Sequence, residues 1–200
     1  MSQLDQIRKQ AEACTRCDLS ISRTKVVFGT GDPDAALMVI GEAPGFHEDQ
    51  EGEPFVGKAG NLLTTLLSEI GLGRDDVYIA NVLKCRPPNN RDPQPIEISK
   101  CEPFLSAQLD EVAPKVIMSL GNFATRYLLD TDVGISQLRG HEFLYRDGVV
   151  IPTYHPSAVL RQGGLALAQA RADFVLAKAA LNRSHADRAV DHAGPSQGRD

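Results

Sequence analysis

The sequence predicts an α/β fold, a three-layer α/β/α sandwich around a central, mostly parallel, four-stranded sheet. Short apolar runs, of the length of buried strands, alternate along the chain with longer segments of helical period. The 200 residues are 42% hydrophobic and 24% charged, which suits one compact domain with a sizeable core. We therefore expect a single domain over residues 1–182, followed by a disordered polar tail over residues 183–200.

The first half of the chain shows helix and strand patterns in alternation. Residues 3–13 are expected to form a short polar helix, and the apolar run 37–40 a buried strand that a glycine ends. Leucines recur at helical spacing over residues 57–70, so a helix is expected there. Residues 77–83 form the second expected strand.

Prolines punctuate the segment that follows. Pro95 suits the first turn of a helix, whereas Pro103 lacks the N–H that an interior helical position needs. Two shorter helices, separated near Cys101, are therefore expected in place of one long helix.

The last part of the chain contributes further strand patterns and a closing helix. Residues 116–120 form the third expected strand, and a helix follows from Asn122. The apolar runs 143–145 and 149–151 flank an Arg-Asp-Gly turn, which predicts a hairpin. The alanine-rich segment 165–181 is expected to form the last helix.

Ligands of a parallel sheet bind beyond the carboxyl ends of its strands. Four loops are expected to meet at that edge, and they have the most distinctive sequences of the chain. These loops are 41–55, 81–91, 121–122 and 154–161.

Charge and hydropathy restrict the choice of partners. The net charge of −5 argues against a nucleic-acid partner, but the distribution is uneven: Lys84, Arg86 and Arg91 form a stretch without any acid. No apolar run reaches the 18 residues of a membrane span, so no membrane partner is expected. No signal segment opens the chain, so we expect a reducing, cytoplasmic location in a prokaryote, associated with the nucleoid.

The four cysteines are Cys14, Cys17, Cys85 and Cys101, a Cys-x-x-Cys pair and two separated residues. Four thiolates are the number that fills an iron–sulfur cluster or a tetrahedral zinc site. Structural zinc usually shows two close pairs, so the spacing suits a cubane cluster at least as well. Cysteines without a ligand, or with a redox role, are the third interpretation.

Three loops carry residue types that suit a ligand. The glycine-rich loop after the first strand could bind phosphate through its backbone, although a tight turn explains it equally well. Asn81, at the end of the second strand, can offer both a donor and an acceptor to a pyrimidine edge, or simply cap a turn. His155 precedes Pro156 at an expected strand end and is either functional or a structural histidine.

Taken together, these motifs resemble those of family 4 uracil-DNA glycosylases, the iron–sulfur-containing, thermostable-type branch of the superfamily. The resemblance covers residues from about Cys14 to Leu181 with every motif in order, and the four cysteines fall where that family ligates a [4Fe–4S] cluster. The matching motifs are Gly41-Glu42-Ala43-Pro44-Gly45, residues 54–60, Lys84-Cys85-Arg86-Pro87-Pro88-Asn89-Asn90-Arg91 and His155-Pro156-Ser157.

The resemblance implies an enzyme that flips uracil out of DNA and hydrolyses its N-glycosidic bond, leaving an abasic site. By the family pattern, Phe55 stacks on the base, Asn81 bonds its polar edge and His155 donates toward O2. Backbone from Gly41 to Ala43 closes the pocket.

The residue that positions the water is less settled by the resemblance. Another branch of the superfamily has an Asp where this chain has Ala43, and alanine cannot orient a water. Glu42 is the first candidate, with loop bracing as its alternative role. Glu48 together with Asn90 is the second candidate.

The resemblance also implies a DNA-contacting surface. Val159 and Leu160 lie where the superfamily places an apolar wedge, although core packing explains them equally well. The expected contacts to phosphate come from Lys84, Arg86, Arg91, Arg161 and the backbone of Ser157.

We expect a monomer that acts on single- or double-stranded uracil-containing DNA, and the tail could recruit a repair or replication partner. A catalytically inactive or covalently trapping iron–sulfur module is the alternative. The trapping branch carries an extra Arg/His-containing loop after the second strand, which Lys84-Cys85-Arg86-Pro87-Pro88 lacks, so turnover is expected. A zinc-stabilised nucleotide hydrolase using Glu48, Asp49 and Glu51 is a further rival.

Overall fold

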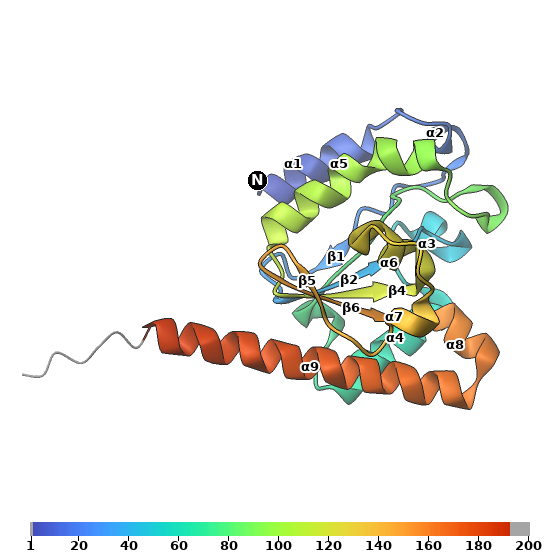
Figure 1. Cartoon of the computed structure of the whole chain (residues 1–200). Coiled ribbons are helices and arrows are strands. Elements are labelled where there is room, and N and C mark those ends of the chain that lie inside the picture. Colours follow the sequence, from blue (N-terminus) through green and yellow to red (C-terminus); the bar gives the residue numbers. More distant parts are fainter. Residues whose placement is uncertain (1, 193–200) are drawn as a thin grey trace, which may run out of the picture.

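In the computed structural model, which describes residues 2–192 and their side chains as far as Ser184, a six-stranded sheet lies between two layers of helices (Figure 1). The strand order is β1-β3-β2-β4-β6-β5, in which β3, β2, β4 and β6 are parallel and the two outer strands antiparallel. The strands are β1 Thr30–Gly31, β2 Leu37–Gly41, β3 Tyr78–Asn81, β4 Val116–Leu120, β5 Phe143–Tyr145 and β6 Gly148–Thr153. The predicted three-layer fold with a mostly parallel sheet is confirmed.

The prediction of four strands is wrong, because both edges carry an additional strand. Strand β1 has two residues, too few to leave a period-2 pattern in the sequence. At the other edge, the predicted hairpin adds β5 as well as β6 to the sheet. The four central strands are nevertheless the parallel ones that hold the expected ligand loops.

Helices cover both faces of the sheet (Figure 1). Helices α5 and α6 pack on one face, with α1 against α5, and α4, α8 and α9 cover the other face. The described helices are α1 Gln3–Glu12, α2 Leu19–Ser22, α3 Phe46–Glu51, α4 Gly57–Glu69, η1 Arg74–Asp76, η2 Pro88–Asn90, α5 Pro95–Val112, α6 Gly121–Leu129, α7 Ile135–Leu138, α8 Pro156–Gln162 and α9 Gly164–His192.

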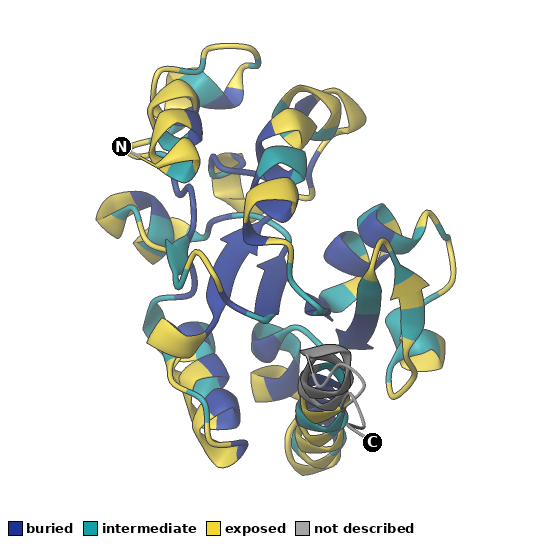
Figure 2. Cartoon of the chain, turned by 90° about the vertical axis from the view of Figure 1, so that its left-hand side faces the viewer, coloured by how far each residue is buried: buried dark blue, intermediate teal, exposed yellow. Residues whose placement is uncertain are grey.

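Each buried strand divides its side chains between the two layers. In β2, Leu37 and Val39 join the cluster that includes α4 and α9, while Met38 and Ile40 join the cluster with α5 and α6. Figure 2 shows the result: the central strands β2, β3 and β4 are buried throughout, whereas the edge strands β1 and β5 are not, and most exposed residues lie on the outer surfaces of the helices and in the loops. Burial on both faces explains why the strands read as continuous apolar runs.

Two helix predictions need correction. Helix α5 runs unbroken through Pro103, which costs about 3 kcal/mol. Burial of Phe104, Leu105 and Leu109 in the same helix offsets that cost. Helix α9 continues to His192, beyond the predicted end, because no glycine or proline interrupts the sequence there. The rest of the predicted tail, residues 193–200, lies outside the described residues.

The parallel strands all end at the same edge of the sheet, so the loops that follow β2, β3, β4 and β6 converge. The loop after β2 contains a helix, α3, that the sequence did not predict. Of the helices in the described part of the chain, none has the length and apolar character that crossing a bilayer requires.

Candidate active site and cysteine centre

The four converging loops line one cleft of about 790 Å³. Every loop predicted to carry ligand-binding residues contributes to it. The cleft is lined by these predicted site residues: Glu42, Ala43, Glu48, Phe55, Asn81, Asn90, Arg91, His155, Ser157 and Arg161.

The floor of the cleft depends on Gly41. This residue pairs in register with Asn81 across β2 and β3. A Cβ at position 41 would lie 2.4 Å from Asn81 Oδ1 and 2.4 Å from Phe55 Cζ. Only glycine therefore allows the amide of Asn81 and the ring of Phe55 to meet at this point.

Phe55 adopts a left-handed conformation, with φ of 54°. Arg74 holds the segment in place, donating to the carbonyl of Pro54 at 2.7 Å and to that of Phe55 at 3.2 Å. The first turn of α4 also has to pass close by, since a Cβ on Gly60 would lie 1.7 Å from the Phe55 carbonyl oxygen. These contacts maintain a strained residue whose ring forms one wall of the site.

Asn81 is 2% exposed, and its Oδ1 is the one buried side-chain polar atom without a hydrogen-bond partner in the described part of the chain. Buried acceptors of this kind are rare in folded proteins because each leaves a desolvation cost uncompensated. The oxygen faces the cleft floor beside Phe55. It is therefore poised to accept a hydrogen bond from a ligand.

His155 is the N-cap of α8, and its protonation state follows from its contacts. Its Nδ1 accepts from the Ser157 backbone N–H at 3.2 Å and lies 2.8 Å from Ser157 Oγ. An accepting Nδ1 places the ring proton on Nε2. Burial, and to a lesser extent the charge of Arg161, lowers the pKa of His155 to about 4. The histidine is thus a neutral Nε2–H donor at neutral pH, with its ring 5.6 Å from that of Phe55.

The two candidate sets for positioning water differ in what they contact. Glu48 accepts a hydrogen bond from the Val56 N–H at 3.1 Å and so braces the loop before α4. Asn90 Oδ1 accepts from Arg86 Nε at 2.7 Å. Glu42 lines the cleft, and burial followed by the nearby Asp92 raises its pKa to about 7.

The four cysteines come together away from the cleft, around a separate small cavity, and none forms a disulfide. Three of their sulfurs receive N–H groups. Arg16 Nε lies 3.4 Å from Cys14 Sγ, Arg23 Nη1 lies 3.4 Å from Cys85 Sγ, and the Lys84 backbone nitrogen lies 3.3 Å from Cys101 Sγ. Such donors stabilise sulfur ligands that carry negative charge.

The arrangement distinguishes between the two metal interpretations. Among the described residues, no three His, Cys, Asp or Glu side chains are grouped closely enough to hold a single metal ion. Zinc needs four ligands at about 2.0–2.3 Å from one point, whereas a cubane cluster spreads its four cysteines over several irons. Cysteines that share a cavity without meeting at a point fit a cluster better than zinc.

Comparison with known proteins agrees with these features. The family model of the uracil DNA glycosylase superfamily matches residues 28–180. A type-4 uracil-DNA glycosylase of Archaeoglobus fulgidus is 49% identical over 168 residues, covering 80% of this chain and 84% of that protein. This chain belongs to the type-4 uracil-DNA glycosylases. Type-4 enzymes of Thermotoga maritima and Sulfurisphaera tokodaii are similarly close, at 48% over 157 residues (78% of this chain, 82% of the relative) and 46% over 169 (80% and 77%).

Two residues predicted to contact DNA in this type-4 glycosylase are buried instead. Lys84 is 1% exposed, and its ammonium donates to the Asn81 carbonyl at 2.7 Å and to Gln108 Oε1 at 2.5 Å, so it cannot reach a phosphate. Val159 is 2% exposed and belongs to the core cluster with α4 and α9, so it cannot act as a wedge. Both predictions failed because a sequence shows residue type and not burial.

The remaining predicted DNA-contacting residues of the glycosylase lie at the surface or cleft. Leu160 is 52% exposed, as a wedge requires. Arg86 is placed over the ring of Phe46, 5.1 Å from its centroid, and Arg91 forms a two-point ion pair with Glu97. The backbone N–H of Ser157 is occupied by His155.

Sequence reasoning missed several residues that line the glycosylase cleft or support its walls. Asp92 directly follows the motif Lys84-Cys85-Arg86-Pro87-Pro88-Asn89-Asn90-Arg91 and could have been included with it. Arg126 and Tyr154 line the cleft from α6 and from the segment after β6. Arg74 had no local signal, since its role depends on carbonyls about twenty positions earlier.

Proposed function

We propose that this chain removes uracil from DNA by hydrolysing the N-glycosidic bond, releasing free uracil and leaving an abasic site. The observation that carries the proposal is the unpartnered Oδ1 of Asn81, buried beside the Phe55 ring in the same cleft as a neutral His155. The type-4 relatives do not favour an inactive or trapping module.

Recognition follows from the chemistry of the Asn81 amide. Uracil presents an N3–H next to O4, so Oδ1 accepts from N3–H and the amide NH₂ donates to O4. Cytosine has an unprotonated N3 and an amino group at these positions, which would leave both amide groups facing like partners. The base has to leave the stack to reach Asn81, and Phe55 then stacks against it in place of the lost neighbours.

Departure of uracil leaves negative charge on O2 and N1. The Nε2–H of His155 donates to O2 and stabilises that charge. A neutral imidazole suits this task because its donor remains available without a proton being transferred. Ser157 acts on the reaction through His155, since its N–H fixes the tautomer.

We assign to Glu42 the role of positioning the attacking water. Its carboxylate accepts a hydrogen bond from the water and orients it toward the anomeric carbon. Glu48 and Asn90 shape the same side of the cleft through their contacts with Val56 and Arg86. Gly41 and Ala43 supply backbone to the same side, and the absence of a side chain at Gly41 leaves room for Asn81 and Phe55.

DNA binding uses Arg86, Arg91 and Arg161 for phosphate contacts and Leu160 as the wedge that fills the vacated space. We take the substrate to be single- or double-stranded uracil-containing DNA. The enzyme is a single-domain monomer of a prokaryotic cytoplasm, associated with the nucleoid. The tail of residues 183–200 would recruit a repair or replication partner, and its residues 193–200 lie outside the described part of the chain.

Cys14, Cys17, Cys85 and Cys101 would hold a [4Fe–4S] cluster. When bound, the cluster supplies a structural tie between the N-terminal segment and the loop that follows Asn81. The chain's own residues also join these segments: Arg23 donates to the Cys14 carbonyl at 2.7 Å and lies 3.4 Å from Cys85 Sγ in that loop, and Asp49 of α3 accepts from the Thr24 N–H at 2.9 Å.

The direct test is a single-turnover assay on a labelled oligonucleotide with one uracil, followed by alkali to break abasic sites. Cleavage of the uracil strand, with none for thymine or cytosine, is the expected result. A protein–DNA band that survives denaturation would instead indicate trapping, and no cleavage by folded protein would contradict the proposal. His155→Ala should be inactive under conditions in which His47→Ala, an exposed histidine outside the cleft lining, is active.

A further inference from the structure

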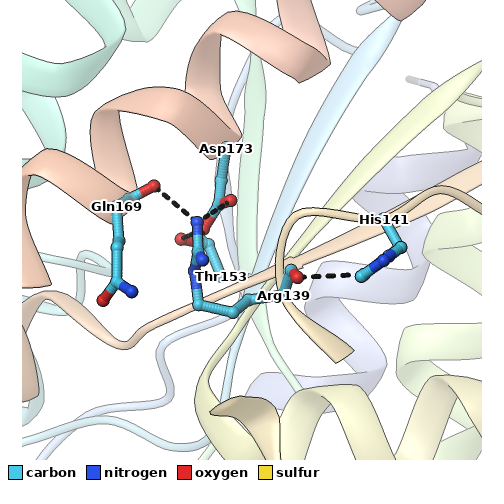
Figure 3. Close-up of polar contacts among 5 residues, drawn as sticks. All are labelled: Arg139, His141, Thr153, Gln169 and Asp173. Atoms are coloured by element: carbon cyan, nitrogen blue, oxygen red, sulfur yellow. Dashed lines mark hydrogen bonds and ion pairs between the residues drawn. The ribbon is translucent and has the colours of Figure 1, made fainter. Parts of the chain in front are cut away.

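A buried ionic network lies at the end of β6 (Figure 3). At its centre is Asp173 of α9, whose side chain is fully buried. Arg139, just after α7, donates through Nε to Oδ2 at 3.0 Å and through Nη2 to Oδ1 at 2.5 Å. The Thr153 hydroxyl, from the last residue of β6, donates to Oδ2 at 2.7 Å.

The network joins three elements that are distant in the sequence. Arg139 and Asp173 are 34 positions apart, and Thr153 and Asp173 are 20 apart. Arg139 Nη2 also donates to the Gln169 carbonyl at 2.9 Å, one turn earlier on α9. Burying a carboxylate is costly unless it is paired and hydrogen-bonded, and here one Arg and one hydroxyl satisfy both oxygens.

The network holds the backbone that leads into His155. Only Tyr154 separates Thr153 from His155, and the Arg139 guanidinium lies 5.7 Å from the centre of the Tyr154 ring. Thr153 is itself aligned with Leu120 in the sheet. On the far side, the β4–α6 turn leaves little room, since a Cβ on Gly121 would lie 3.0 Å from that of His155.

We propose that Asp173, Arg139 and Thr153 are positioning residues for His155, which set the place of its Nε2–H in the cleft. None of the three lines the cleft, so they act on the reaction only through the strand end. The inference rests on the proposed function of His155 as the donor to uracil O2.

The importance of this support follows from the geometry that the donor needs. A hydrogen bond to the developing charge requires about 2.7–3.1 Å between donor and acceptor, and a displacement of about 1 Å can cost about 10²-fold in rate. The Ser157 contact fixes how the imidazole ring is turned. It does not fix where the backbone of His155 lies, because Ser157 belongs to the same segment, and the network supplies that reference.

The test is a double-mutant cycle on the full-length, cluster-loaded protein, with the single-turnover rate constant and KM as readouts. Thr153→Val removes the hydroxyl at constant shape, and Thr153→Ser restores it. Thr125→Val is the matched control, because it also removes a buried hydroxyl, one that bonds Ser119 at 2.8 Å.

We expect Thr153→Val to lower the rate constant about tenfold with little change in KM, Thr153→Ser to recover most of it, and Thr125→Val to be near wild type. In a His155→Ala background, Thr153→Val should cause no further loss, because the residue through which it acts is gone. An equal loss in both backgrounds, or none in the wild type, would overturn the inference. If His155→Ala alone leaves the rate unchanged, the proposed function of His155 fails instead.

A second measurement does not depend on activity. The His155 ring signals in an NMR spectrum report its surroundings in the folded protein. They should shift or broaden in Thr153→Val and in Arg139→Lys, and remain unchanged in Thr125→Val. Unchanged signals in both network variants would show that the strand end holds His155 without them.

Discussion

The molecule buries one charge behind each of two cleft residues, and the two are compensated differently. Asp173 lies on the side of His155 away from the cleft, and its carboxylate forms an ion pair with Arg139. Lys84 lies next to Asn81, and its ammonium donates to a carbonyl and an amide oxygen and lies 5.9 Å from the centroid of the Phe28 ring. In the described part of the chain it forms no ion pair with a carboxylate.

This difference in charge compensation indicates that the Asn81 side of the site, and not the His155 side, depends on the four cysteines. Burial lowers the pKa of Lys84 to about 8, while negative charge on Cys101 and Cys85 favours its charged form. The His155 side therefore has its own counter-charge, whereas the Asn81 side would receive part of its counter-charge from Cys85 and Cys101 when these sulfurs are metal ligands. We therefore predict that loss of a cluster held by these cysteines would disturb uracil recognition before it disturbs His155.

The largest effect is expected from substituting one of the four cysteines. Cys101→Ser should abolish the brown colour and the absorbance near 400 nm that cysteine-ligated iron gives, and lower the melting temperature. The measurement is iron content, visible spectrum and thermal unfolding. Ser20→Ala, in the lining of the same cavity, is the control and should keep the iron. Full iron content in Cys101→Ser would show that this residue is not a ligand.

Removal of the His155 imidazole tests the side of the site whose buried charge is paired with an arginine. His155→Ala should lower the single-turnover rate constant by about 10²-fold or more, because a donor to the departing base is lost. The fold should be retained, since the Asp173–Arg139 pair remains. Single-turnover kinetics at saturating enzyme measure this, and a rate within about threefold of wild type would be incompatible with the assigned role.

Lys84→Met sharpens the comparison, because it removes the buried charge without touching a cysteine. The Asn81 carbonyl then loses its donor, so binding of the flipped base should weaken about tenfold, mainly in KM. Thr153→Val, on the other side, should act mainly on the rate constant. Both variants are compared on one uracil substrate by measuring KM and the single-turnover rate constant. If both variants change the two constants equally, the two sides of the site do not differ in function.

A further effect concerns the pH dependence of the rate and distinguishes the two groups that could titrate, His155 and Glu42. His155, with a pKa of about 4, stays neutral from pH 5 upward, whereas Glu42 loses its proton near pH 7. The rate should therefore rise up to about tenfold per pH unit below 7 and level off above it. Glu42→Gln should be slow at every pH, and a persisting rise in that variant would assign the titration elsewhere.

The same shifts affect stability with opposite signs. The folded-state pKa of Glu42 is raised above 4.5, so its contribution is present below pH 4.5 and lost as pH rises through about 7. That of His155 is lowered below 6.5, so its contribution is present above pH 6.5 and lost as pH falls through about 4. Thermal unfolding of Glu42→Gln against wild type at pH 5 and 8 measures the first effect.

Much of the cleft could be predicted, because its motifs follow strands whose pattern is local. Asn81 and His155 were expected at or just after strand ends, where the structure has them, and the family resemblance gave the backbone of Gly41 a place at the pocket. That no side chain fits at position 41 is a finding of the structure. Prediction failed where a residue's neighbours are distant in the sequence. A lysine within a basic stretch looks the same whether it faces phosphate or, as Lys84 does, a glutamine 24 positions away.

The sequence by itself determined the alternation of strands and helices, the four cysteines and the order of the motifs, since each depends on residue type and short-range spacing. Only the tertiary structure decided which charges are buried and what each one supports. It brings Asp173 and Arg139 together behind His155, Lys84 and Gln108 behind Asn81, and Arg74 behind Phe55. Such contacts form between elements that pack side by side, and long-range packing leaves no period in the chain.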